Sequence, residues 1–578
     1  MATRQRRTVC RAIGIWQILL LISLTVNSSD LIGNETSPKA LQGPSRVARD
    51  FGIPQVGVIN TQIGQSWIDN EVTPSAAATD GEFCRRLFLD LIGRIPSTTE
   101  LESYLADRRP GKQRRLVERL LYDDAYRVEY TRHWSTVWNN TLIGRSGGDE
   151  RNSPIDRDGM LKYLRDSFAH NKPYNTLVKE LVSATGTNKP GTDSFNGAVN
   201  FLAGKLEEGA AQATAQTSKI FLGLQVQCTQ CHNHPFNEWK QQQYWQMNAF
   251  FRQTRTLRRY EAGTRDVRFV ELTDEDFAGE DRPIEPDIAR VYYELRNGRL
   301  EAALPTFVDG TSIDPSGYLE DVNRREQLSQ LILRSDYMPR IMVNRTWAQF
   351  LGYGFTKPVD DMGPHNPAVN PELLNYLADE FSKNSYDIKQ LMTWIVLSQP
   401  YGLSSKTTKN NREDDPQLGN PPQFSHFYVR QMTAEQLYES LLLASGAAEA
   451  QGSYQKQQKA KDDWLRQFTI AFGTDEGDET TTFDGTITQT LMMFNGDLIK
   501  QATKAEKGSF LHDVVTDSRS RYTNQIQQLF LAALSRRANK TESRMAQQLL
   551  AAYPGDGNAA LKDLWWALLN SNEFILNH

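Results

Sequence analysis

The residues of this sequence that most directly indicate chemistry form a Cys-x-x-Cys-His motif at residues 228–232. In c-type haem proteins the two thiols of such a motif form thioethers with the porphyrin, and the imidazole ligates the iron. The motif therefore predicts a haem attached at Cys228 and Cys231, with His232 as axial ligand. The same three side chains together with His234 would also suit zinc, because thiolates and imidazoles are its usual ligands. The two cysteines could also form a disulfide or stay as reduced thiols.

A haem iron needs a second axial ligand and apolar surroundings. Residues 238–251 have helical spacing and carry several aromatic side chains, which would supply an apolar wall. Met247 is the nearest downstream thioether, so we predict it as the sixth ligand. His133 and His170 are further candidates, whereas His234 is too close to His232 in the chain. For each candidate taken alone, an ordinary packed or surface side chain is the simpler interpretation.

A second polar cluster lies on the proline-rich stretch at residues 357–367. The adjacent carboxylates of Asp360 and Asp361, close to His365, could bind a divalent cation or a polar substrate. Aspartates before proline-rich turns more often supply caps and turn hydrogen bonds. We therefore keep the binding role as the weaker interpretation of this loop.

The N-terminus has the pattern of a targeting segment. Several arginines precede a largely apolar run at residues 12–26, which is shorter than the about 20 apolar residues of a spanning helix. We predict residues 1–29 as a signal peptide or an uncleaved anchor, which is the only expected membrane contact. The body of the protein is then extracytoplasmic, in the periplasm or at the cell surface. Export agrees with haem attachment, and four cysteines are few for a disulfide-stapled secreted protein.

Length and composition indicate a multidomain globular protein. The chain has 578 residues and a net charge of −5, and this mild acidic excess gives no reason to expect nucleic acid as a partner. Helical periodicity dominates, so we predict a mainly α, multi-helical fold. The predicted divisions after the N-terminal segment are a linker of little regular structure at 30–78, a helical domain at 79–254, a β-rich insertion at 255–320 and a second helical domain at 321–578.

Local signals place several of these elements. Ser97 and Glu100 have the spacing of a capping box at a helix start. A helix predicted over residues 212–227 leads directly into the motif. The Asn297-Gly298 pair, between two segments rich in β-forming residues, is typical of a tight hairpin. Residues 449–480 are polar and predict a long exposed loop.

Two sequence patterns recur along the chain. Residues 87–94 are echoed by residues 529–536, and a Thr-Glu helix start follows each of them. The end of an apolar helix, a polar turn and an aromatic residue also recur, for example at 120–126 and 568–574. Shared helix-end chemistry is the simpler explanation, and a duplicated helical unit with both chain ends built alike is the alternative.

The sequence resembles a known family in several of its motifs. These are residues 83–96, 227–239, 343–347, 358–361, 371–374 and 567–574. They are similar to motifs of the large planctomycete proteins that pair domain of unknown function 1549, the cytochrome-like planctomycete domain, with domain of unknown function 1553. The resemblance covers most of residues 80–578 and implies an exported, mainly helical protein without a known reaction. The chain departs from the family pattern at Asn233, where aspartate is usual, at His365, usually a small polar residue, and at Asn370, usually histidine. The last two departures weaken a catalytic role for His365.

Two functions of different classes follow from these observations. The first is an exported c-type haem protein that moves electrons to or from a redox partner. The second is a non-haem binding or scaffold protein with a structural metal site at Cys228, Cys231, His232 and His234, beside secreted enzymes. A hydrolase is weaker than both, because the sequence contains no His-Glu-x-x-His.

Overall fold

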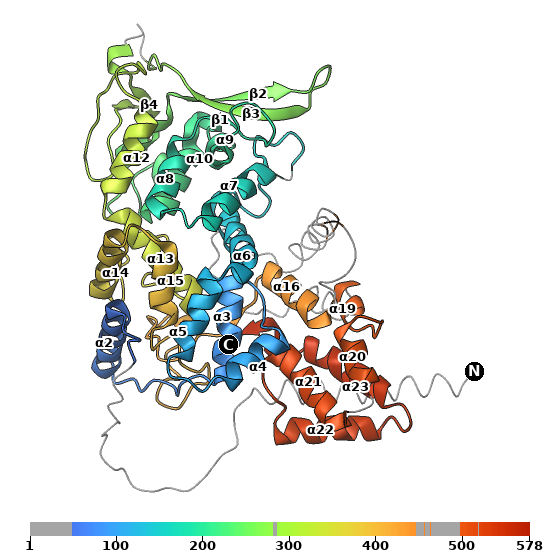
Figure 1. Ribbon diagram of the computed structural model, residues 1–578. Helices are drawn as coiled ribbons and strands as arrows, with labels where there is room; N and C mark the ends of the chain where they lie inside the picture. The colour runs from blue at the N-terminus through green and yellow to red at the C-terminus, as the bar shows by residue number, and fades with distance from the viewer. Residues whose placement is uncertain are drawn as a thin grey trace.

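The structure of the chain is a computed structural model. It describes residues 49–148, 150–280, 286–446, 497–517 and 520–578, together with Ser453, Lys456 and Asp463. The predicted targeting segment and nearly all of the predicted loop at 449–480 lie outside these residues. Figure 1 shows a mainly helical molecule with a small β-rich region at one end, which confirms the predicted fold class. No helix in these ranges is both long and apolar enough to cross a membrane.

The regular elements have the following bounds. The α-helices are α2 (Pro54–Asp69), α3 (Asp80–Ile92), α4 (Thr98–Ala106), α5 (Lys112–Tyr122), α6 (Asp124–Ile143), α7 (Arg157–Ala169), α8 (Tyr174–Ser183), α9 (Asn200–Ala203), α10 (Glu207–Thr217), α11 (Gln241–Asn248), α12 (Arg324–Arg334), α13 (Tyr337–Leu351), α14 (Pro371–Lys383), α15 (Ile388–Val396), α16 (Ala434–Ser445), α19 (Asp497–Ala502), α20 (Phe510–Thr516), α21 (Tyr522–Leu534), α22 (Lys540–Ala551), α23 (Gly557–Leu569) and α24 (Asn572–Ile575). The strands are β1 (Gly186–Thr187), β2 (Thr254–Tyr260), β3 (Val267–Asp274), β4 (Val291–Glu294), β5 (Leu300–Ala303), β6 (Arg430–Gln431) and β7 (Leu576–Asn577). Short helical turns include η2 (Ser218–Leu222), η3 (Gln227–Gln230) and η4 (Ala249–Phe251).

The prediction of an irregular linker at 30–78 is wrong for residues 54–69, which form the helix α2. Its buried side chains follow a helical stripe that includes Val56, Ile59 and Ile63. This stripe packs beside α14 and α15, and Trp67 donates from Nε1 to the carbonyl of Gln423 at 2.8 Å. Polar residues between the apolar positions hid the stripe in the sequence, and packing against the distant helices stabilises it.

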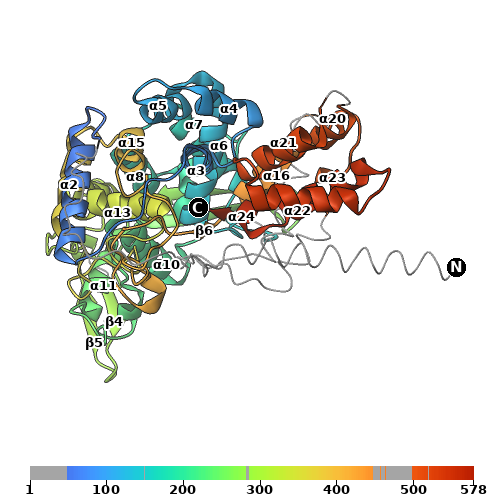
Figure 2. The ribbon, with the colours of Figure 1, turned by 90° about the horizontal axis from the view of Figure 1, so that it is seen from below.

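Two hydrophobic cores organise the helices. The larger core runs from Val56 to Phe427 and Tyr428, and it also includes Leu531. The second core is built mainly by residues 432–575, with Leu89 and Ile95 contributed from the region of α3. Figure 2 shows α21, α22 and α23 set to one side of the rest of the molecule. This division of packing differs from the domain division predicted from the sequence, whose limits stay a prediction.

The predicted β-rich insertion is present as small antiparallel sheets. Strands β2 and β3 pair along most of their length and β1 adds to β3, while β4 and β5 form a separate hairpin. The turn of this hairpin contains Asn297 and Gly298, as predicted, and Gly298 has a φ of 80°. The buried guanidinium of Arg324 anchors the insertion to α12 by donating to the carbonyls of Ala249 and Ala289.

The recurring sequence pattern corresponds to a recurring structure. Arg94 follows α3, stands over the ring of Phe88 and donates to Glu100 at the start of α4 and to Glu129 on α6. Arg536 follows α21, stands over Phe530 and donates to Glu542 on α22 and to Glu573 on α24. Both glutamates that follow the arginines complete capping boxes, with Ser97 and Asn539 respectively. This common arrangement favours the hypothesis of a duplicated helical unit.

Candidate functional site

The Cys-x-x-Cys-His motif lies on a loop between η2 and α11, and not at the end of a long helix. The helix predicted over 212–227 is wrong for its last residues, because α10 passes into a π-helical turn that ends at Leu222. Gly223 then takes a left-handed conformation with a φ of 67°, which a side chain would oppose. A Cβ at this position would also approach Met362 to 3.0 Å. The turn η3 then carries the first cysteine.

The thiols of the motif are free. Cys228 and Cys231 are exposed and not joined by a disulfide, whereas Cys84 is fully buried on α3. Cys84 is therefore a packed small side chain of the core. Burial raises the pKa of the Cys84 thiol well above its ordinary value, which leaves this group inert. Chemistry at cysteine in the described chain therefore concentrates at the motif.

Helix α11 fixes the motif loop by hydrogen bonds to its backbone. The carbonyl of Gln230 accepts from Nε2 of Gln241 at 3.2 Å and from Nε1 of Trp245 at 3.1 Å. The indole of Trp245 in turn stacks on the ring of Tyr293 in β4, with the two planes 9° apart. The β-hairpin therefore supports the helix that holds the motif.

The two motif histidines are held in opposite tautomers. Nδ1 of His232 lies 2.6 Å from the carbonyl oxygen of Asn233, which can only accept, so Nδ1 carries a proton, and in the neutral ring Nε2 carries the lone pair. Nδ1 of His234 instead accepts from the backbone N–H groups of Phe236 at 3.2 Å and Asn237 at 3.1 Å. The neutral ring of His234 therefore has its proton on Nε2. In this arrangement His232 can offer a nitrogen to a metal, and His234 cannot.

The other predicted ligands have different surroundings from those of the motif cysteines. Met247 is buried in the main core with an exposed fraction of 1%, whereas both motif cysteines are exposed. His133 is buried against Trp134, and His170 is exposed at the end of α7 with Nδ1 2.7 Å from the carbonyl of Asp166. Met247 as the sixth ligand stays a prediction. No three histidine, cysteine, aspartate or glutamate side chains of the described chain form a group that could hold a metal ion.

The loop at 357–367 packs directly against the motif loop, although the two are more than 120 residues apart in sequence. The N–H of Met362 donates to the carbonyl of Gly223 at 2.7 Å. Asp360 accepts from Nε2 of Gln225 at 2.8 Å. The rings of His234 and His365 lie with centroids 6.3 Å apart. The tertiary structure thus unites two motifs that the sequence presented separately.

The carboxylates of this loop are engaged within the protein. Asp360 pairs with Lys219 at 3.3 Å as well as with Gln225, and Asp361 lies 2.9 Å from Nε2 of His365. These contacts agree with the structural interpretation of the two aspartates. The predicted role of the pair in binding a cation or a substrate stays a prediction.

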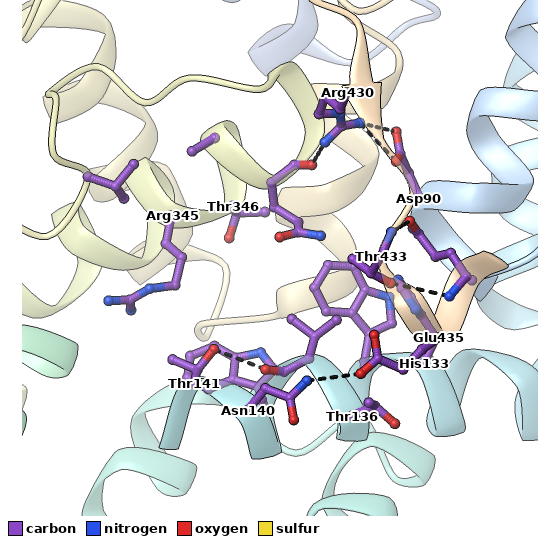
Figure 3. Close-up of a pocket in the computed structure, with 18 of the residues that line it drawn as sticks. Asp90, His133, Thr136, Asn140, Thr141, Arg345, Thr346, Arg430, Thr433 and Glu435 are labelled. Carbon is purple, nitrogen blue, oxygen red and sulfur yellow. Dashed lines mark hydrogen bonds and ion pairs between the residues drawn. The ribbon is translucent and has the colours of Figure 1, made fainter. Parts of the chain in front are cut away.

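A cavity of about 440 Å³ lies between α6 and α13, and Lys219 and Ile220 of η2 also line it (Figure 3). Its remaining walls include the end of α3, the start of α16, and strands β6 and β7. Most of the lining residues have polar or charged side chains, and apolar surface lies between them. Lys219 and Asp360 line the cavity and also hold the loop at 357–367, so the same ion pair borders both features.

Ion pairs account for most of the charge on the cavity wall. Arg430 donates to both carboxylate oxygens of Asp90 at 2.9 Å, and Arg145 lies 3.1 Å from Glu435. Burial alone would raise the pKa of Glu435, but Arg145 and the hydrogen bond from Asn140 outweigh it, so the pKa is lowered. The carboxylates on this wall are therefore matched by cations.

Arg345 on α13 was missed from the sequence as a candidate site residue. Its Nη1 donates to the carbonyl of Ile220 at 2.9 Å, and no carboxylate in the described ranges pairs with it. The sequence signal that could have indicated Arg345 is its position within 343–347, one of the family-like segments. An arginine on a helix is ordinarily solvated, so no local pattern indicates that this one borders a cavity.

Comparison with known proteins gives two adjacent family matches. Residues 58–256 match the family model PSCyt2, described as a protein of unknown function (DUF1549). Residues 324–482 match the model PSD1, described as a protein of unknown function (DUF1553). No curated protein and no solved structure matches the chain. The motif loop lies in the first match and the loop at 357–367 in the second, so the two loops meet where the matched regions pack together.

Proposed function

This chain belongs to the proteins that pair DUF1549 with DUF1553, and we propose that it is an exported, c-type-cytochrome-like electron-transfer protein. A haem would be attached at Cys228 and Cys231, with His232 as its axial ligand. The proposal places the protein outside the cytoplasmic membrane, where it exchanges electrons with a redox partner. Bound at this site, the haem would supply reversible one-electron chemistry at its iron.

The tautomer of His232 is the observation that carries this proposal. Its Nδ1–H is bonded to the carbonyl of Asn233, which orients the ring and keeps Nε2 free to ligate a metal. His234 has the opposite arrangement, since its Nδ1 accepts two backbone hydrogen bonds. A site with one histidine ligand beside two cysteines matches haem attachment, whereas a zinc site of two cysteines and two histidines needs both rings.

The other groups of the loop fit the same purpose. Both thiols are free and exposed, as the formation of thioethers requires. The aromatic side chain of Phe236, which contacts His234, is 86% exposed, and it would offer apolar surface to a porphyrin. The hydrogen bonds from Gln241 and Trp245 hold the loop backbone in place while both thiols stay accessible.

Expression of the exported chain with a haem-maturation system tests the proposal. We expect a Soret band in the purified protein and a haem stain that survives denaturing electrophoresis. The double variant Cys228→Ala/Cys231→Ala should lose both signals. Cys84→Ala is the matched control, because Cys84 is buried on α3 and should not affect attachment.

A pair of histidine variants separates the two metal hypotheses. His232→Ala should alter the Soret band, whereas His234→Ala should leave it unchanged. A colourless wild-type protein that contains one zinc per chain, lost in both histidine variants, would contradict the haem proposal and favour the structural metal site. Elemental analysis of the same samples measures the zinc.

A further inference from the structure

We propose that the cavity between α6 and α13 binds a small monoanion that carries several hydroxyl groups, such as a sugar acid, and that Arg345 holds its charge. The cavity volume of about 440 Å³ falls within the range of small-molecule sites. Side chains from both family-matched regions line it, as does the C-terminal strand β7. This proposal does not depend on whether a haem is bound at the motif.

Among the described residues, the charges on the wall leave one lining cation without an ion-pair partner. Each of the four lining carboxylates forms an ion pair with a lining cation: Asp90 with Arg430, Asp360 with Lys219, Glu435 with Arg145 and Glu439 with Arg132. Arg345 is the fifth lining cation, and no carboxylate among the described residues lies within ion-pair distance of it. The excess of one positive charge suits a ligand with one negative charge.

Arg345 is positioned to bind an anion. One nitrogen of its guanidinium is fixed on the carbonyl of Ile220, and the rest of the planar group stays available for a carboxylate. Figure 3 shows Arg345 apart from Asp90 and Glu435, on the other side of the drawn site. This separation reduces repulsion between those carboxylates and an anion that is bound to Arg345.

Hydroxyl acceptors surround the same space. The hydroxyls of Thr136, Thr141 and Thr346 each donate to the carbonyl four residues earlier in their own helix, which leaves oxygen lone pairs free to accept. The side-chain amides of Gln216 and Gln349 also line the cavity, and they make no hydrogen bond within the described chain. These groups would accept from, and donate to, the hydroxyls of a ligand.

A residue of the cavity wall on β7 has a buried acceptor without a partner in the described chain. Asn577 is 2% exposed and donates from Nδ2 to Asp90 at 2.7 Å. Its Oδ1 is buried and accepts no hydrogen bond from any described residue. An unsatisfied buried carbonyl costs about 1–3 kcal/mol. Because this oxygen has almost no surface open to the cavity, a ligand hydroxyl could reach it only after a shift of the Asn577 side chain.

Calorimetric titration with D-glucuronate tests the proposal. D-Glucose is the probe without the charge, and acetate is the probe without the hydroxyls. We expect glucuronate to bind at least about tenfold more tightly than either, because both a charge-assisted pair and hydroxyl contacts contribute. Equal binding of glucose would overturn the role of the charge. Equal binding of acetate would overturn the role of the hydroxyls, and no binding of glucuronate would overturn the proposal as a whole.

A pair of arginine variants locates the site. Arg345→Gln should weaken glucuronate binding about tenfold or more, while Arg334→Gln, which changes an exposed arginine at the end of α12, should not. Unchanged binding by Arg345→Gln, with a melting temperature like that of the wild type, would place the ligand elsewhere. If this variant does not fold, Arg345→Lys keeps the charge but loses the planar fork, and it should weaken binding by a smaller factor. Binding by Arg345→Lys as tight as that of the wild type would then overturn bidentate recognition by Arg345.

Discussion

Gln225 donates a hydrogen bond from Nε2 to Oδ1 of Asp360 at 2.8 Å, across 135 positions of sequence. The other oxygen of Asp360 faces Nζ of Lys219 at 3.3 Å. Asp360 therefore ties the segment that leads into Cys228 to the loop at 357–367. The conformation of the cysteine motif depends on a carboxylate from the other family-matched region.

We predict that Asp360→Ala destabilises the protein by about 2–3 kcal/mol, because it leaves Gln225 and Lys219 without their partner. Gln225→Ala should cost less, about 1 kcal/mol, since the pair between Asp360 and Lys219 remains. Chemical denaturation measures both effects. Asp361→Ala is the matched control, because the carboxylate of Asp361 contacts His365 and not the segment before Cys228. An equal loss of stability in Asp361→Ala would contradict the assigned role of Asp360.

The cysteines should differ sharply in reactivity when the chain is made without haem. Cys228 and Cys231 are exposed and should react with iodoacetamide in the folded protein. Cys84 should react only after unfolding, because it is fully buried and its pKa is raised. Mass spectrometry of the labelled peptides measures the three sites separately. Rapid native labelling of Cys84 would show that α3 is less tightly packed than described.

Arg94 with Glu100 and Glu129, and Arg536 with Glu542 and Glu573, form two related arginine clamps. They should contribute unequally to the free energy of unfolding. The side chain of Arg94 is 9% exposed, and Arg94→Met should cost about 3–5 kcal/mol by leaving Glu100 and Glu129 uncompensated. The side chain of Arg536 is 32% exposed, so solvent screens its pairs and Arg536→Met should cost about 1–2 kcal/mol. Urea denaturation of the two variants gives the comparison. A larger loss in Arg536→Met would mean that burial does not set the strength of these clamps.

Acid should weaken the Arg94 clamp through Glu100. Burial alone would raise the pKa of Glu100, but the hydrogen bonds and charge of Arg94 outweigh it and lower the pKa from 4.5 to about 2. The contribution, about 3 kcal/mol, is therefore fully present above pH 4.5 and is lost as the pH falls through about 2. The difference in unfolding free energy between wild type and Glu100→Gln should shrink across this range. A difference that stays constant with pH would contradict the lowered pKa.

Arg324 should be essential for docking the β-rich insertion. Its fully buried guanidinium donates to the carbonyls of Ala249, Ala289, Pro315 and Ser316, and burial lowers its pKa to about 10, so it stays charged at neutral pH. Arg324→Met should cost about 3 kcal/mol or more, because several buried carbonyls lose their donor. Arg334→Met, at the exposed end of the same helix, is the control. Proteolysis within residues 255–320 should accelerate only in Arg324→Met.

The sequence correctly predicted local features whose residues lie close together along the chain. The capping box of Ser97 and Glu100 and the hairpin turn at Asn297-Gly298 agree with prediction, because each depends on residues within a few positions of one another. The helix α2 was missed since its apolar stripe is stabilised only by contact with α14 and α15. The buried arginines, such as Arg324, were missed because their partners are carbonyls from other elements.

The donor set at the candidate site can be read from the amino-acid sequence alone: two thiols and an adjacent imidazole, with a second histidine two residues on. Only the tertiary structure decided how these groups are presented. Hydrogen bonds of the folded loop fix the opposite tautomers of His232 and His234. Packing brings Asp360 to Gln225 and places Arg345 at a cavity, where it meets no carboxylate of the described residues. A sequence motif shows which donor atoms a few neighbouring residues can provide. Their protonation, partners and surroundings depend on chain segments that meet only when the cores pack.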